Sequence, residues 1–137
     1  MKQEELQQKY IQLQLLDKQI RELQQQIQLF DSQAAEIQSI IASIGEFKDV
    51  SKGTEILVPI SSGIFARAKL EENKDLLMNV GSNVVVNKNF DDAKKLLSDQ
   101  LDKVKKLQDE WTDELTKLAN KALPLQEEIN KSLQESE

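Results

Sequence analysis

The sequence predicts an α+β protein in which a long antiparallel two-helix coiled coil carries two β-hairpins at its centre. Apolar residues repeat with heptad spacing in the first third of the chain and again in the last third, and such a repeat is typical of coiled coils. Between them, residues 53–88 hold three of the four glycines and consist of short β-type runs separated by turn residues.

Residues 1–45 are predicted to form the first coiled-coil helix. One set of seam positions holds Leu6, Leu13, Ile20, Ile27, Ala34 and Ile41. The other set holds Leu16, Leu23, Phe30, Ile37 and Ile44, with Lys9 as its only polar member. Gly45 is the expected C-cap, since glycine is common just after a helix end. Residues 46–52 then form a polar connector.

The central region, residues 46–88, is predicted to contain two successive hairpins. The expected strands are 55–60, 64–70, 75–80 and 83–88, with polar or glycine-containing turns between them. An isolated hairpin is marginally stable, and its free edges pair readily with other strands. We therefore expect the hairpins to complete a barrel or sandwich with other copies or related subunits. The expected assembly residues are Ile56, Val58, Ile60, Ile64, Phe65, Leu77, Val80, Val84 and Val86.

Residues 89–137 are predicted to form the second coiled-coil helix. Asn89 is the expected N-cap, and the aspartates that follow it suit the positive end of the helix dipole. Folding the two seams antiparallel places Leu13 opposite Leu125 and leaves Phe30 against Gln108, which is the weakest expected layer. Pro124 lacks an amide donor and is expected to kink the helix.

Composition excludes several classes of function. The chain has no cysteine and no histidine, so disulfides, thiolate chemistry and most zinc sites are not expected. No Gly-rich phosphate loop and no nucleophile–base pair occur, and we predict no enzyme activity, no cofactor and no metal. The net charge of −6 argues against a nucleic-acid partner. No apolar run is long enough for a membrane span, so no membrane partner is expected and the default location is cytoplasmic.

The hairpin sequences resemble those of alpha-class prefoldin subunits. The resemblance lies in GTEILVPISSGIF at residues 53–65, NVGSNVVV at 79–86 and KNFDDA at 88–93. It implies a hexamer of two alpha and four beta-type subunits, whose hairpins form a double β-barrel from which coiled-coil arms project. It also implies ATP-independent capture of unfolded proteins and their delivery to a group II chaperonin.

The family works through the tips of its arms, which correspond here to the first and last turns of the coiled coil. Tyr10, Ile11 and Leu15 are apolar although they lie off the seam. The predicted client-binding residues are Met1, Leu6, Tyr10, Ile11, Leu13, Leu15, Ile129 and Leu133. The alternative interpretation is that these side chains pack locally or splay at a frayed end of the coiled coil and bind no client. A rival function is a structural scaffold or filament subunit with prefoldin-like architecture.

Overall fold

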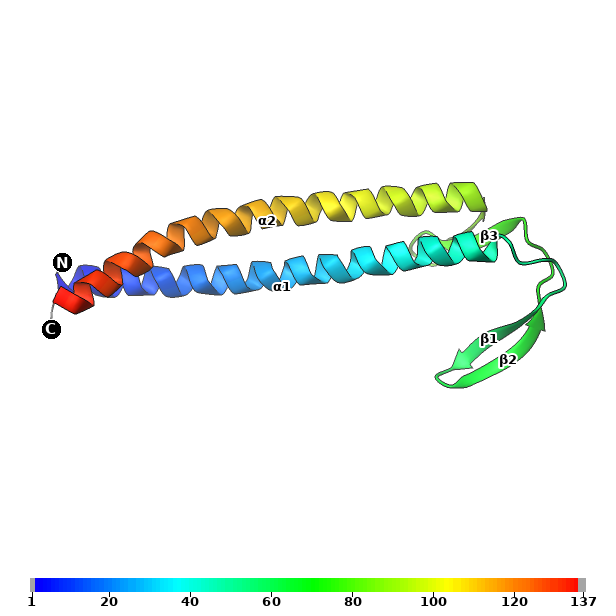
Figure 1. Cartoon of the computed structure of the whole chain (residues 1–137), viewed down its shortest axis with the longest axis horizontal. Coiled ribbons are helices and arrows are strands. Elements are labelled where there is room, and N and C mark those ends of the chain that lie inside the picture. Colours follow the sequence, from blue (N-terminus) through cyan, green and yellow to red (C-terminus); the bar gives the residue numbers. More distant parts are fainter. Residues whose placement is uncertain (1, 136–137) are drawn as a thin grey trace. The chain divides into compact units, whose positions relative to one another are not determined.

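The computed structural model describes residues 2–135 and divides into two compact units. Unit 1 comprises Met1–Ala34 and Lys103–Glu137, and unit 2 comprises Ala35–Asp102. In chain order, the elements are α1 (Gln3–Phe47), β1 (Glu55–Ser61), β2 (Ile64–Lys69), β3 (Asp75–Asn79), β4 (Val85–Asn89) and α2 (Phe90–Glu135). Figure 1 labels all of them except β4. Two long helices and two hairpins confirm the predicted α+β fold class.

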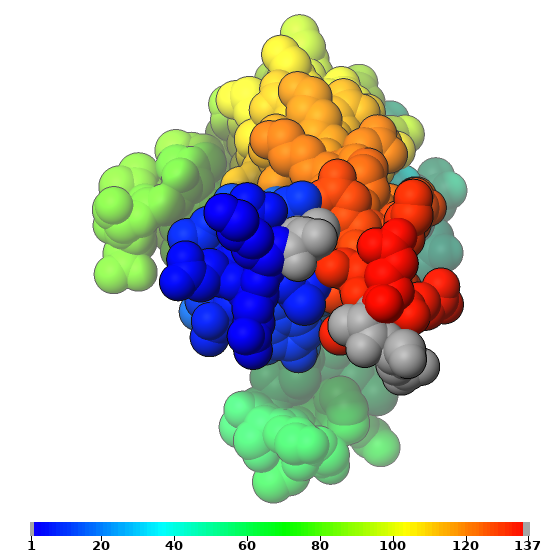
Figure 2. Space-filling model, turned by 90° about the vertical axis from the view of Figure 1, so that its left-hand side faces the viewer, coloured from blue at the N-terminus to red at the C-terminus, as the bar shows by residue number. Residues whose placement is uncertain are grey.

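Apolar side chains of both helices form the core of unit 1. Leu13 on α1 and Ile129 on α2 are buried in one hydrophobic cluster with Ala122. The partly buried residues that pack against this cluster are Leu6, Leu16, Ile20 and Leu125. In Figure 2, which looks onto this end of the unit, the first turns of α1 (blue) lie beside the last turns of α2 (red). The two helices are therefore antiparallel in unit 1, as their heptads predict.

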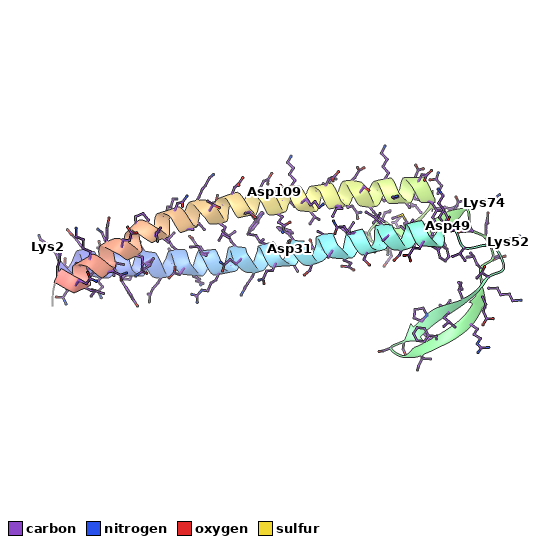
Figure 3. All side chains as sticks on the ribbon, viewed as in Figure 1. Lys2, Asp31, Asp49, Lys52, Lys74 and Asp109 are labelled. Carbon is purple, nitrogen blue, oxygen red and sulfur yellow. The ribbon has the colours of Figure 1, made fainter. Side chains whose placement is uncertain are left out.

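The layer that was predicted to be the weakest is stabilised by two separate contacts. The ring of Phe30 packs edge-on against Trp111, with 6.1 Å between the ring centroids and 74° between the planes. The carboxamide of Gln108 donates a hydrogen bond to Asp31 on α1, which Figure 3 labels. The polar Gln108 thus has a polar partner, while Phe30 has an aromatic one. Edge-to-face aromatic pairs contribute about 0.5–1.5 kcal/mol beyond the burial of their area.

Unit 2 is built around the start of α2. The Oδ1 atom of Asn89 accepts a hydrogen bond from the amide of Asp92 at 2.7 Å, which confirms Asn89 as the N-cap. The buried side chains that follow on α2 are Phe90, Ala93 and Leu97. The Phe90 ring lies 6.3 Å from that of Phe47, the last residue of α1.

Each hairpin forms its own two-stranded antiparallel sheet. β1 pairs with β2, so that Ile56 lies opposite Ala68 and Val58 lies opposite Ala66. β3 pairs with β4, and Met78 lies opposite Val86. Among the described residues, no strand of one hairpin pairs with a strand of the other. All four strands therefore have one edge without a backbone partner.

Asn73 ties together the two connectors on either side of the first hairpin. Its side-chain amide donates to the carbonyl oxygen of Lys48 at 2.8 Å and also to that of Val50. The backbone adds a bond from the amide of Gly53 to the carbonyl of Leu70 at 2.7 Å. Figure 3 labels Asp49, Lys52 and Lys74 in these connectors. The entry to the first hairpin and the exit from it are thereby held together.

Three local predictions need correction or refinement. Gly45 is not the C-cap, because α1 continues to Phe47, whose ring packs on α2. The second hairpin turn is longer than predicted, since Ser82 and Asn83 have positive φ angles and β4 begins only at Val85. Pro124, which was predicted to kink the helix, lies inside α2, and α2 continues to Glu135 and curves within the orange stretch of Figure 1.

Candidate functional site

The hairpins leave many large apolar side chains exposed, and we call this set the hairpin surface. Its members are Leu57, Val58, Ile60, Ile64, Phe65, Leu77, Val80, Val84 and Val85. β-branched and aromatic side chains of this kind pack well between sheets. Leu77 has the largest exposure, at 78%. Exposed apolar surface next to unpaired strand edges marks a site of protein association.

Most of the predicted assembly residues belong to the hairpin surface, with two exceptions. Ile56 and Val86 are half-buried. Sequence reasoning missed Leu57 and Val85, which lie on the opposite faces of their strands from these two. The alternation of side chains along a strand could have predicted both residues, because Leu57 and Val85 each lie directly between two predicted assembly residues and point to the other face of the strand. Leu57 shares its face with Phe65, so the second face of the first hairpin also carries exposed apolar side chains, beside the charged Glu55, Arg67 and Lys69.

Unit 1 carries a second set of exposed apolar side chains close to the start of α1 and the end of α2, which we call the end surface. Its members are Tyr10, Ile11, Leu15, Leu123 and Leu133, each more than half exposed. Sequence reasoning predicted four of them, and chose Tyr10, Ile11 and Leu15 because they are apolar outside the heptad seam. The fourth is Leu133, whereas Leu123 was not among the predicted client-binding residues. The remaining neighbours are mainly glutamine, glutamate and lysine.

The other predicted client-binding residues lie elsewhere. Leu13 and Ile129 are buried in the core of unit 1, and Leu6 packs against that core. They could reach a ligand only if the ends of the two helices separated. Met1 lies outside the described residues. Lys9 forms an ion pair with Glu128 beside this core, and in this way keeps its charge out of the seam.

Two shallow grooves lie between α1 and α2 in unit 1. The first groove, of about 430 Å³, is lined by Gln12, Leu15, Leu16, Lys121, Pro124, Leu125 and Glu128. The second groove, of about 450 Å³, is lined by Gln19, Glu22, Leu23, Gln26, Trp111, Glu114 and Leu118. The first joins the end surface through Leu15. Neither groove was predicted, because heptads specify which residues meet at a seam and not how well the flanking side chains fill the space beside it.

The described residues hold no group of three or more Asp, Glu, His or Cys that could bind a metal ion. None of the helices within residues 2–135 is both long enough and apolar enough to cross a membrane.

Comparison with known proteins gives one consistent family. The family model described as prefoldin subunit matches residues 16–135. A protein of Thermofilum pendens named prefoldin subunit alpha is 29% identical over 91 residues, covering 66% of this chain and 70% of its own length. The prefoldin subunit alpha of Archaeoglobus fulgidus is 24% identical over 125 residues, covering 91% of each chain.

A solved structure has the same fold. The cryo-EM structure of filamentous PFD from Methanocaldococcus jannaschii superposes with a TM-score of 0.76 at 23% sequence identity. The match covers 84% of this chain and 95% of the other.

Proposed function

Because the chain belongs to the prefoldin family, as an alpha-class subunit, we propose that it captures unfolded polypeptides without ATP and delivers them to a group II chaperonin. The family is one of chaperones, and prefoldin subunits form oligomeric complexes. We place the capture step at the end surface of unit 1 and the assembly step at the hairpin surface of unit 2. We propose the cytoplasm as its location, where a chain without cysteine needs no disulfide.

The observation that best supports capture is the exposure of Tyr10, Ile11 and Leu15. Their exposed fractions are 52%, 58% and 57%, although all three are apolar and lie on a regular helix. Pairing with α2 through the heptad seam does not require apolar side chains at these three positions, because none of them is a seam position. Exposed apolar side chains bind the apolar segments that unfolded proteins display. Several such weak contacts on the arms of one complex add up through effective concentration.

Exchange of Tyr10, Ile11 and Leu15 for serine tests the capture step. We expect the assembled triple variant to suppress the aggregation of a chemically unfolded model protein several-fold less effectively. The matched control is Leu29→Ser, which removes an equally exposed leucine from α1 away from the end surface. Native mass spectrometry checks that assembly is intact in both variants. Equal suppression by the triple variant and the wild type would contradict the proposal.

We propose that the hairpin surface pairs this chain with beta-type subunits in a hexamer of two alpha and four beta subunits. Support comes from the unpaired strand edges and from Leu77, because the contact of its exposed side chain with water is unfavourable and would be removed by a partner subunit. A Leu77→Asp exchange should reduce hexamer formation, as measured by native mass spectrometry with a beta-type partner, and leave helix content unchanged. The control is Asn79→Asp, which places the same charge on an exposed polar position of β3 and keeps an oxygen that can accept the hydrogen bond from the Gly81 amide.

A filament is the second candidate for the assembly. The structure from Methanocaldococcus jannaschii is described as filamentous, and this chain shares its fold. Electron microscopy of the chain purified alone separates the two assemblies. Filaments of this chain alone would favour the scaffold function, whereas formation of a mixed hexamer with a beta-type subunit would favour the chaperone.

Delivery to a chaperonin needs its own measurement. A fluorescently labelled unfolded protein, first bound to the assembled complex, should move to a purified group II chaperonin when the two are mixed. Retention of the label on the complex would restrict the function to capture.

A further inference from the structure

The first and second grooves of unit 1 repeat each other with the spacing of the heptad. A step of seven residues along α1 leads from Gln12 in the first groove to Gln19 in the second. The same step along α2 leads from Leu125 to Leu118. Because seven residues make nearly two full turns, both grooves open on the same side of the helix pair. Seven residues rise by about 10.5 Å, which sets the distance between equivalent points of the grooves.

This distance matches an unfolded chain in the polyproline II conformation. Such a chain has three residues per turn and a rise of about 3.1 Å, so every third side chain points the same way at intervals of about 9.3 Å. A β-strand does not match, because its third side chain points to the opposite side. Polyproline II is a major conformer of unfolded polypeptides. The grooves can therefore receive side chains that are three residues apart in a non-native segment.

The carboxamides beside the grooves suit the backbone of such a segment. Gln12, Gln19 and Gln26 line the grooves, and none of them takes part in a side-chain hydrogen bond among the described residues. A glutamine side chain offers both a donor and an acceptor, as the peptide group does. Because a polyproline II backbone makes no internal hydrogen bonds, its N–H and C=O groups are free to pair with these carboxamides.

The two grooves differ in charge. The first groove is lined by Leu15, Pro124 and Leu125. Its charged members are Lys121 and Glu128, and the carboxylate of Glu128 is already paired with Lys9. The second groove contains Glu22 and Glu114 beside Trp111, which is 37% exposed. Two carboxylates and an indole ring attract a Lys or Arg side chain through ionic and cation–π interactions.

We infer that unit 1 binds an extended segment of non-native polypeptide with a large apolar side chain in the first groove and, three residues away, a Lys or Arg in the second. This inference rests on the proposed capture of unfolded chains and adds a sequence preference to it. It also extends the binding surface beyond the end surface, along one side of the helix pair.

The single tryptophan of the chain, Trp111, lies in the second groove and serves as the reporter. Dodecapeptides of Ser and Gln that carry one Leu and one Lys three residues apart, in either order, are titrated into the assembled full-length protein. We expect the better order to shift the Trp111 emission and to bind about fivefold more tightly than the same peptide with Glu in place of Lys. A third peptide carries Leu and Lys seven residues apart, the spacing that a docked helix would need.

Two double variants test whether the carboxylates of the second groove cause the preference for the Lys peptide. Glu22→Gln with Glu114→Gln should abolish it, because both groove carboxylates are lost. The matched control, Asp17→Asn with Asp109→Asn, removes the same charge outside the grooves and should retain the preference. Figure 3 labels Asp109 on α2. All four are exposed positions on helices, so far-UV circular dichroism should be unchanged in both double variants.

Several outcomes would overturn the inference. These are equal binding of the Lys and Glu peptides, an equal loss of preference in the two double variants, or tighter binding of the peptide with seven-residue spacing, which would show a helical occupant. In any of these cases, continued suppression of aggregation by the wild type would leave the proposed capture function in place. Loss of suppression in the wild type would instead contradict the proposed function itself.

Discussion

Replacement of Ile129 by alanine should open the end of unit 1 without unfolding the rest of the chain. Ile129 is 3% exposed, and its side chain lies in a cluster with Leu13 and Ala122. Exchange of a buried isoleucine for alanine usually costs about 2–5 kcal/mol. Because only two helices enclose this site, the neighbours can collapse into the space, and we expect a cost near the lower end, about 2–3 kcal/mol. The opening equilibrium of this region should then rise by about 30- to 150-fold.

Amide hydrogen exchange with mass spectrometry measures this local opening directly. Peptides from the first turns of α1 and the last turns of α2 should exchange faster in Ile129→Ala, whereas peptides from unit 2 should be unaffected. The matched control is Leu133→Ala, one helical turn further along, where the side chain is 52% exposed. We expect it to change the opening free energy by less than about 0.5 kcal/mol. Equal acceleration in the two variants would refute the assignment of Ile129 to the core.

Three further predictions concern the backbone and are measured as changes in the midpoint of chemical denaturation. Gly45→Ala should stabilise the chain by about 0.5–1 kcal/mol, because Gly45 lies inside α1 and an added Cβ would contact nothing within 4 Å; destabilisation would mean that the helix ends at Gly45. Gly63→Ala should destabilise the first hairpin by about 1 kcal/mol or more, because its φ angle of 79° is unfavourable for alanine although space is available; a neutral effect would contradict this turn geometry. Asn89→Ala should cost about 0.5–2 kcal/mol through loss of the N-cap of α2, and Asn89→Asp should retain most of it; equal loss in both variants would show that Asn89 acts through another contact.

The helices and their antiparallel pairing could be predicted from the sequence because heptads specify them directly. A seam residue such as Leu13 has to be buried against another helix, and its partner is found by counting equal distances from the central hairpins. The same counting could not show that Phe30 meets Trp111 while Gln108 turns to Asp31. These contacts depend on rotamers, which a repeat of seven residues does not encode.

The ends of elements were less predictable, because local signals compete with tertiary contacts. Gly45 has the right residue type for a C-cap, but Phe47 extends α1 by packing on Phe90. Asn89 was predicted correctly because a capping side chain acts within its own turn and depends on no distant partner. The hydrogen bonds from the Asn73 side chain to the carbonyl oxygens of Lys48 and Val50 join residues more than 20 positions apart, and no local sequence pattern predicts them.

The candidate surfaces could be predicted only where an apolar residue contradicts its local pattern. Tyr10, Ile11 and Leu15 stand out because they break the polar side of a heptad helix. Leu57 did not stand out, because an apolar residue in a β-type run is expected on one face and the run alone does not show that both faces are exposed. The two grooves were not predictable at all, since they depend on how the flanking side chains fill the space beside the seam.

The two apolar surfaces call for different kinds of partner. The hairpin surface combines β-branched and aromatic side chains with unpaired strand edges. Another sheet that packs on it permanently would bury these side chains and pair the free backbone groups of the edges. The end surface lies on helices that satisfy most of their backbone hydrogen bonds internally, so it offers mainly side-chain contact. Its apolar residues are interrupted by polar ones, which limits the area that any ligand can bury. The hairpin surface therefore favours permanent assembly. The end surface favours binding that is weak at each site and reversible, and the capture and release of many different unfolded chains requires binding of this kind.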